Sequence, residues 1–150
     1  MNRRCGIVIL GLCALLLPAS LSAQRPPDPE REAVRRVIET FAEHVEANEL
    51  SALDSLFPPR GLHILVDHAT THGWPEYRDQ HLVPEMESFP ELRYEHTAIE
   101  PVVRGDVAWV AFRRLLSSGA SGAEPAQGRG TAVLERRDGR WVIVHLHMSR

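Results

Sequence analysis

The chain contains no lysine and almost no cysteine, and each shortage removes a class of chemistry. All 17 basic residues are arginine, so no lysine amine is present to form a Schiff base with a carbonyl substrate. The two cysteines, Cys5 and Cys13, both lie near the N-terminus. Removal of that segment would leave a chain without any thiol for a disulfide, for nucleophilic catalysis or for metal binding.

Short catalytic motifs are also missing. The sequence has no glycine-rich phosphate loop, no nucleophile elbow, no HExxH zinc motif and no calcium-binding loop. Gly128, Arg129 and Gly130 could be mistaken for a phosphate-binding turn, but they lead into a predicted strand, whereas phosphate-binding turns open a helix. No reaction can therefore be assigned from a local motif.

The N-terminus has the composition of a secretory signal sequence. Arg3 and Arg4 give a positively charged start, and an uncharged apolar run follows from Cys5 to Leu17. This run is too short for a comfortable membrane span. We predict that residues 1–23 are a signal cleaved after Ala23, followed by export to a periplasm or to the medium, with no stable membrane insertion afterwards. An uncleaved N-terminal anchor is the alternative.

The remaining segment is acidic and has the length of one domain. Loss of Arg3 and Arg4 leaves 15 basic against 20 acidic residues, a net charge of −5 when the histidines are neutral. This charge argues against nucleic acid and against anionic membrane surfaces as partners. After a short linker at residues 24–28, residues 29–150 are long enough to build a single domain with one hydrophobic core.

The first half of this domain is predicted to be mainly helical. Three segments have helical spacing of apolar residues: Pro29 to about Asn48, Leu50–Leu56, and Pro75 to about Phe89. Pro84 lacks a backbone donor, so we expect a kink or a restart near Val83. Between the second and third helices, the pattern predicts a strand over Leu62–Val66 and a turn over Thr70–Gly73.

The second half alternates with the period of β-strands. Four antiparallel strands are predicted: Arg93–Glu100, Asp106–Leu116, Gly130–Arg137 and Arg140–His147. Segments 104–106 and 138–139 have the composition of hairpin turns, and segment 117–128 is expected to be a longer loop. Helices followed by a run of antiparallel strands indicate an α+β domain, in which the helices pack on one face of a curved sheet.

This pattern resembles the NTF2-like superfamily, in particular its SnoaL-like branch, which is related to polyketide cyclases. Three stretches carry the resemblance: the opening helix with Phe41 and segment 47–53, segment 73–82, and the closing segment 138–149. The resemblance implies a cone of helices and curved, mostly antiparallel sheet with a pocket on the concave face, and it implies that homodimers are common. Related pocket enzymes include isomerases, dehydratases and cyclases that use His, Asp and Tyr.

The last strand places two histidines in an otherwise apolar segment. Side chains alternate between the two faces of a strand, so His145 and His147 are predicted to share a face with Trp141 and Ile143. Nothing in sheet formation requires imidazoles there. We therefore predict that the two histidines line a pocket, the alternative being that their ring nitrogens bond backbone or water.

The predicted hairpin register supports this cavity. If Asp138 and Gly139 form a two-residue turn, Ala132 lies opposite His145 and Gly130 lies opposite His147. Small residues opposite two imidazoles would leave open space in front of them. The prediction fails if a β-bulge interrupts the pairing.

A third histidine could complete a site. His81 lies on the predicted third helix, with Glu85 four residues further on. One hypothesis is that His81, His145 and His147 bind one divalent ion such as zinc, with Glu85 or Asp67 as a further ligand, which would suit a metal-assisted hydrolase. Without a metal, the three histidines and Asp67 are candidate acid–base groups for an isomerase, dehydratase or cyclase.

Three functions remain open at this point. The first is binding or conversion of a small, partly apolar molecule in a histidine-lined pocket. Its wall is predicted to include four further residues: Trp141, Trp109, Tyr77 and Ile143. The second is a divalent-metal-binding module, and the third is a non-catalytic dimerisation or accessory domain that pairs through the outer face of the sheet. His96, on the first long strand, is predicted to be exposed or paired with a carboxylate.

Overall fold

The computed structural model describes residues 28–89, 91–118 and 124–150. The predicted signal sequence at 1–23 and the linker through residue 27 lie outside the described residues. Within the described part of the chain, no helix has the length and apolar character needed to cross a membrane.

Helix α1 spans Pro29–Glu46, in agreement with the prediction. The Asp28 side chain caps it by accepting a hydrogen bond from the Glu30 backbone N–H at 3.0 Å. One face of the helix is buried, through Val34, Ile38, Phe41, Ala42 and Val45. This face packs mainly against strand β3 (Leu92–Arg104) and closes one side of the hydrophobic core.

Two further helical segments lie on either side of a two-stranded hairpin. The short 3₁₀ helix η1, over Ala52–Leu56, precedes the hairpin. A longer helical run follows it and consists of three consecutive pieces: α2 over Trp74–Tyr77, the π-helical turn η2 over Arg78–Leu82, and α3 over Val83–Ser88. The wider π-helical turn ends at Leu82, two residues before Pro84, which cannot donate a backbone hydrogen bond. The restart predicted near Val83 is therefore confirmed.

Six strands form one mixed sheet. Besides β3, they are β1 (His63–Val66), β2 (Ala69–His72), β4 (Val107–Ser118), β5 (Ala126–Arg137) and β6 (Arg140–Ser149). Their order across the sheet is β2-β1-β6-β5-β4-β3, and every neighbouring pair is antiparallel except β1 with β6. The α+β class and the mostly antiparallel sheet are thus confirmed.

Two predicted connections were wrong. The segment expected as a turn at Thr70–Gly73 is largely strand β2, and the turn lies earlier, at Asp67 and His68, where Asp67 has a φ of 49°. Strands β4 and β5 extend further into the predicted loop at 117–128 than expected. Residues 119–123 of that loop lie outside the described residues.

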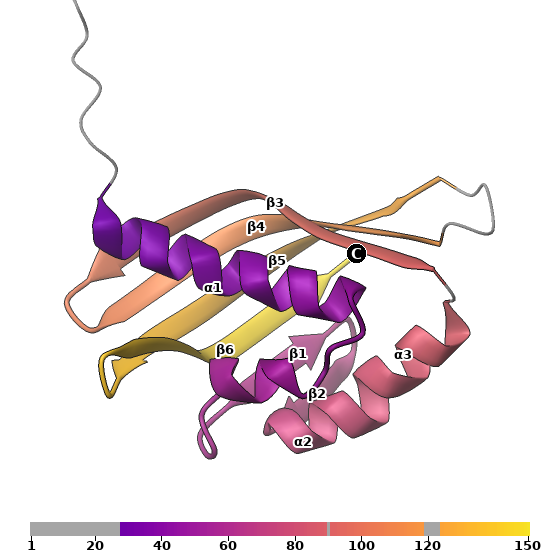
Figure 1. Cartoon of the computed structure of the whole chain (residues 1–150), viewed down its shortest axis with the longest axis horizontal. Helices are drawn as coiled ribbons and strands as arrows, with labels where there is room; N and C mark the ends of the chain where they lie inside the picture. Colours follow the sequence, from indigo (N-terminus) through magenta and orange to yellow (C-terminus); the bar gives the residue numbers. More distant parts are fainter. Residues whose placement is uncertain (1–27, 90, 119–123) are drawn as a thin grey trace, which may run out of the picture.

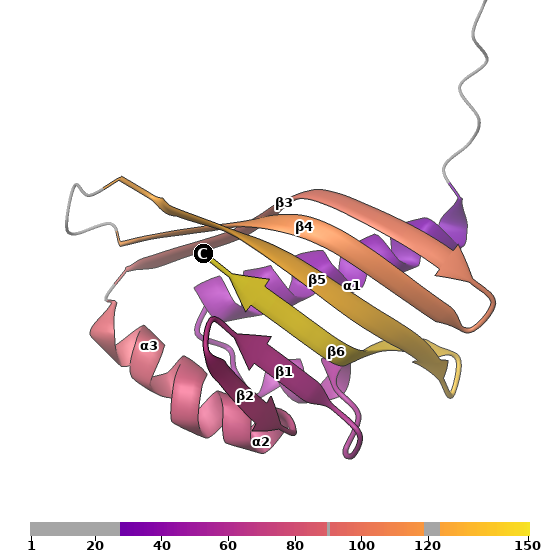
Figure 2. The ribbon, with the colours of Figure 1, turned by 180° about the vertical axis from the view of Figure 1, so that it is seen from behind.

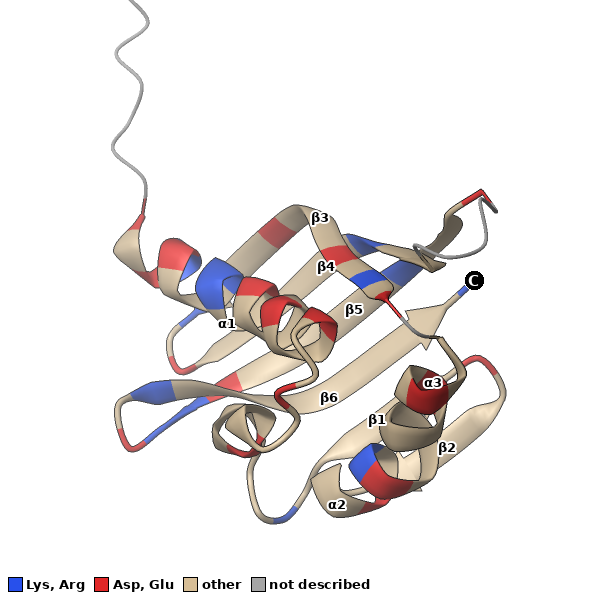
Figure 3. Cartoon of the chain, turned by 45° about the vertical axis from the view of Figure 1, so that its right-hand side comes forward, with Lys and Arg blue, Asp and Glu red and all other residues tan. Residues whose placement is uncertain are grey.

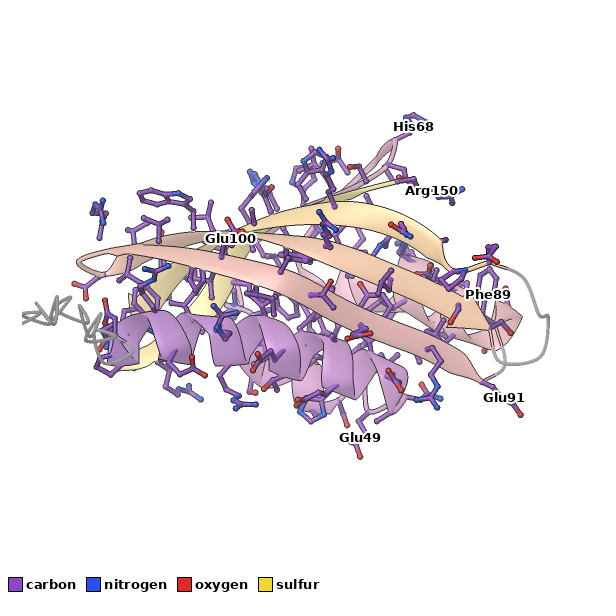
Figure 4. The ribbon with its side chains drawn as sticks, turned by 90° about the horizontal axis from the view of Figure 1, so that it is seen from above. Glu49, His68, Phe89, Glu91, Glu100 and Arg150 are labelled. Carbon is purple, nitrogen blue, oxygen red and sulfur yellow. The ribbon has the colours of Figure 1, made fainter. Side chains whose placement is uncertain are left out.

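The sheet is curved and only one of its faces carries α1 (Figure 1). Its strands contain two register shifts, one between Thr97 and Glu100 and one next to Val133, and such bulges increase bending and twist. We call the face that packs against α1 the inner face and the opposite one the outer face. From behind, strands β3 to β6 have no helix in front of them (Figure 2), and Glu100 projects on the side away from α1 (Figure 4).

Candidate functional site

A cavity of about 280 Å³ lies between the α2–α3 run and the sheet, beside the C-terminal ends of β1 and β4 and the N-terminal end of β5. Apolar side chains from three different elements contribute to its wall: Val66, Phe89 and Leu116. Polar groups from η2, α3 and β4 lie among them: His81, Glu85 and Arg114. A concave, partly apolar site with a few convergent polar groups is typical of a small-molecule pocket.

His81 forms one wall of this cavity together with Glu85. The His81 Nε2 atom lies 3.7 Å from a carboxylate oxygen of Glu85, one helical turn further along. The ring of Tyr77 stacks against the imidazole with centroids 5.1 Å apart and an interplanar angle of 20°. Tyr77 is buried behind His81, so its ring fixes the orientation of the imidazole toward the cavity.

Arg114 reaches the cavity from the inner face of β4. It continues the inward series of Val110 and Phe112, and it is only 6% exposed. The buried hydroxyl of Tyr94 lies beside it and donates a hydrogen bond to the Met148 sulfur at 3.3 Å. Burial raises the pKa of Tyr94 to about 12 even though the neighbouring Arg114 charge lowers it, so this hydroxyl stays protonated at neutral pH.

His96, paired with Arg114 across strands β3 and β4, is buried as well. Its Nδ1 lies 3.1 Å from the Ile38 carbonyl, to which it donates, while its Nε2 has no hydrogen-bond partner among the described residues. Aromatic rings pack against it: the ring centroid of Phe41, which is stacked on the imidazole, lies 5.6 Å from the His96 centroid, and that of Phe112 lies 4.3 Å away. Burial, helped by the Arg114 charge, lowers the pKa of His96 to about 4. The prediction of an exposed or carboxylate-paired His96 was wrong.

The cavity mouth is bordered by Asp67 and the C-terminal Arg150. The Arg150 guanidinium lies 3.2 Å from an Asp67 carboxylate oxygen, and the Arg150 backbone N–H donates to the other oxygen at 3.1 Å. Asp67, which directly follows strand β1 and was predicted to reach a pocket, does line the cavity. Its carboxylate is paired with Arg150.

A β-bulge places the two C-terminal histidines on the wrong face for the predicted pocket. The two-residue turn at Asp138 and Gly139 forms as predicted, with φ angles of 51° and 76°. Ile143 pairs with Leu134, but the next pair is His145 with Val133, so Val144 is an extra residue on β6.

The bulge reverses the alternation of every later residue on β6. Trp141 and Ile143 point to the inner face as predicted, but Leu146 and Met148 follow them there and are fully buried. His147 is exposed and His145 half-buried on the outer face. The predicted shared face of Trp141 with His145 and His147 was therefore wrong.

The small residues thought to face the histidines have other neighbours. Ala132 pairs with Leu146, and Gly130 pairs with Met148. A Cβ atom added at Gly130 would collide with the ring of Phe112, so that ring already occupies the space. The open space predicted in front of His145 and His147 does not exist in this form.

His145 instead belongs to a row of outward-facing histidines across three strands. It pairs with His63 on β1, which pairs with His72 on β2. The rings of His63 and His72 lie 5.1 Å apart in an edge-to-face arrangement. Partial burial lowers the pKa of His145, and the charges of His147 and His63 lower it further.

The predicted metal site is not assembled. His81 lines the cavity on the inner side of the sheet, whereas His145 and His147 lie on the outer side, so the sheet separates them. Across residues 28–89, 91–118 and 124–150, no group of three or more His, Cys, Asp or Glu side chains is placed to hold a metal ion. Glu85 remains next to His81, with a carboxylate oxygen 3.7 Å from the His81 Nε2 atom.

None of the four residues predicted for the pocket wall lines the cavity. Trp141 is buried elsewhere in the core, where its Nε1 donates to Glu30 at 3.1 Å. Ile143 is fully buried in the core, and Tyr77 lies behind His81. Trp109 is 47% exposed on the outer face, the surface through which a homodimer was predicted. The homodimer stays a prediction.

The most informative residues of the cavity were not predicted from the sequence. Arg114 lies in a strand whose two faces are both rich in apolar residues, so periodicity could not assign its face. Phe89 belongs to the predicted third helix and lies at the end of the molecule near that helix (Figure 4). The sequence offers no signal that distinguishes Arg114 from the adjacent Arg113, which lies exposed on the opposite face of the same strand.

The fold has many solved counterparts. An NTF2-like protein of unknown function from Pseudomonas putida superposes with a TM-score of 0.72 at 17% identity, covering 81% of this chain and 86% of its own. An NTF2-like protein of unknown function from Shewanella oneidensis superposes with a TM-score of 0.63 at 23% identity, covering 82% of this chain and 100% of its own. A protein with a cystatin-like fold from Nostoc punctiforme superposes with a TM-score of 0.71 at 10% identity, covering 82% of this chain and 92% of its own.

The sequence itself identifies the family. A search of curated proteins finds no match. The sequence model of the SnoaL-like domain matches residues 34–150, which include most of α1, all six strands and every residue named above in the cavity wall. The chain therefore belongs to the SnoaL-like domain family, and it shares the fold of the solved NTF2-like proteins.

Proposed function

We propose that this protein binds a small, partly apolar molecule in the cavity beside α3, with His81 placed to exchange a proton with it. The observation that supports this best is the composition of the cavity wall. Three apolar side chains and a His81–Glu85 pair surround a space of about 280 Å³, close to the lower end of the range for ligand pockets. The fold alone does not choose a chemistry, because the same fold supports unrelated functions.

The exposure of Phe89 is a second reason. This large apolar side chain is 42% exposed although it borders the cavity. Apolar surface left in water is unfavourable by about 25 cal/mol per Å², so a ligand that covers the ring gains binding energy there. A wholly polar solute would not use this surface.

The arrangement of His81 suits proton transfer. Imidazole can both accept and donate a proton near neutral pH, and the neighbouring Glu85 carboxylate, 3.7 Å from the His81 Nε2 atom, is placed to orient the ring. Tyr77, stacked on the other side, holds the ring in place. If the bound molecule is also converted, we expect His81 to act as the acid–base group and Glu85 to orient it.

Two matched tryptophan variants test the location of binding. Ala126 lines the cavity, whereas Ala111, also an alanine on a long strand, is exposed on the outer face. In Ala126→Trp the indole fills the cavity, and in Ala111→Trp it does not. Affinities for small aromatic and aliphatic compounds are measured by titration calorimetry on the wild type and both variants.

We expect Ala126→Trp to weaken binding at least tenfold and Ala111→Trp to leave it unchanged. Equal affinity in all three proteins would place the binding site elsewhere. For any compound that is turned over, His81→Gln should reduce kcat by about 10²–10⁴-fold with little change in KM, as expected for loss of a general acid–base group.

A further inference from the structure

Arg114 is a buried cation that the fold leaves without a carboxylate partner. The residue is 6% exposed and lines the cavity. Among residues 28–89, 91–118 and 124–150, no carboxylate oxygen lies within 4.0 Å of its guanidinium group. Taking a charge out of water is unfavourable unless another group compensates it. A cation at this position therefore calls for a partner of opposite charge.

The carboxylates that border the cavity are engaged elsewhere or lie at its edge. Glu85 pairs with His81 at 3.7 Å, and Asp67 pairs with Arg150 at 3.2 Å. Glu124 is exposed at the cavity rim. Acidic residues occur both along α1 and along the α2–α3 run (Figure 3), but of those on the α2–α3 run only Glu85 lines the cavity. Within the described part of the chain, none of the acidic groups thus contacts Arg114 directly.

The buried polar neighbours of Arg114 cannot supply a negative charge either. The Tyr94 hydroxyl has a pKa of about 12 and stays protonated at neutral pH. The His96 ring has a pKa of about 4 and stays neutral, so it adds neither a compensating negative charge nor a repelling positive one. The inner end of the cavity consequently presents one positive charge that no carboxylate of the described residues contacts within 4.0 Å.

We propose that the ligand of this cavity is a small organic carboxylate whose anionic group binds Arg114. A guanidinium can donate two parallel hydrogen bonds to a carboxylate, which adds both strength and orientation. The apolar part of the ligand then lies against Val66, Phe89 and Leu116. This inference rests on the small-molecule function proposed above and adds the charge of the ligand. Because all 17 basic residues of the chain are arginine, the residue type alone is not informative, and the inference rests on the burial of Arg114 in the cavity wall.

Paired probes separate charge from shape. The purified protein is titrated calorimetrically with 3-phenylpropanoate and with octanoate, each compared with its primary amide at neutral pH. Amide and carboxylate have nearly the same shape, but only the carboxylate is charged. Because hydrogen bonds to charged groups are the stronger ones, we expect the acids to bind about tenfold to a hundredfold more tightly than the amides.

Two neighbouring arginines provide a matched pair of variants. Arg114→Met removes the buried cation, and Arg113→Met removes an exposed arginine that points to the outer face from the next position on β4. We expect Arg113→Met to keep the wild-type preference for acids. Arg114→Met should bind acid and amide with equal affinity, because the partner of the carboxylate is gone.

The stability of the ligand-free variant gives a second readout that does not depend on choosing the right probe. If Arg114 has no partner in the free protein, Arg114→Met should melt at the same temperature as the wild type or higher. A clearly lower melting temperature would show that Arg114 is compensated within the fold, and it would overturn the proposal.

The outcomes distinguish this inference from the proposed function. Acids and amides of equal affinity in the wild type, both displaced by Ala126→Trp, would overturn the carboxylate inference and leave the small-molecule function standing. A preference for acids that survives in Arg114→Met would also overturn it, because another residue would then recognise the anion. No binding of either class at millimolar concentration would count against the small-molecule function itself.

Discussion

His96 links the stability of the fold to pH, because the folded protein protonates this ring far less readily than the unfolded chain. Burial lowers its pKa from 6.5 to about 4, and the charge of Arg114 acts in the same direction, while the hydrogen bond to the Ile38 carbonyl opposes them. A lowered folded-state pKa means that protonation favours unfolding. The stabilisation is fully present above pH 6.5 and is lost as the pH falls toward 4.

The expected loss is large compared with the total stability of a domain. One pKa unit corresponds to about 1.4 kcal/mol, so protonation linked to His96 should remove about 2 kcal/mol of unfolding free energy by pH 5 and about 3 kcal/mol by pH 4. Domains of this size are stable by about 5–15 kcal/mol. Measurement at pH 5 is preferable, because most carboxylates are still ionised there.

The variant His96→Asn isolates this contribution. An asparagine amide can still donate a hydrogen bond toward the Ile38 carbonyl, but it does not titrate. Unfolding free energies are measured by urea denaturation at pH 7 and pH 5 for both proteins. The wild type should lose about 2 kcal/mol more than His96→Asn between the two pH values. Equal losses would show that His96 is not held neutral by burial, and they would refute the reasoning.

Two further predictions concern the sheet. Gly130→Ala should lower the unfolding free energy by about 1–3 kcal/mol in urea denaturation, because the added methyl group collides with Phe112; in a Phe112→Leu background the cost should shrink, and an unchanged cost would contradict this packing. If the outer face pairs two copies, Trp109→Glu should shift the mass measured by light scattering from dimer to monomer, since Trp109 is 47% exposed there. A monomeric wild type would exclude that interface.

The regular parts of the fold could be predicted from local sequence because their signals are local. The Asp28 cap, the spacing of Ile38 and Phe41 and the acidic first turn identify α1 without any knowledge of its partners. Asp138 and Gly139 tolerate the positive φ angles that a two-residue hairpin turn requires. Most of the element order then follows from the sequence, and with it the fold class, although strand β2 was predicted as a turn.

The faces of the last strand could not be predicted in the same way. A bulge at Val144 has no local signal, because Val142 and Val144 suit either face of a strand. One inserted residue reverses the face of every later side chain, and it moves His145 and His147 from the predicted pocket to the outer face. The faces of the later residues are set by tertiary packing, because Leu146 and Met148 are buried in the core.

The cavity depends on contacts between elements that are distant in the sequence. His81 and Asp67 were candidates from the start and do border the cavity, on η2 and after β1 respectively. Arg114 and Leu116 join them only because β4 passes beside the α2–α3 run, which periodicity does not reveal. His96 is buried among aromatic rings for the same reason: α1 packs over β3 and covers a position that alternation alone leaves undecided.

Chemical-shift mapping tests the location and nature of the site most directly. Backbone amide spectra of the ¹⁵N-labelled protein are recorded during titration with 3-phenylpropanoate. We predict saturable shifts concentrated around His81, Arg114 and Leu116, at the end of the sheet that faces α3. Shifts concentrated instead around His63 and His145 on the outer face, or no saturable shifts at all, would contradict a carboxylate-binding cavity on the inner face.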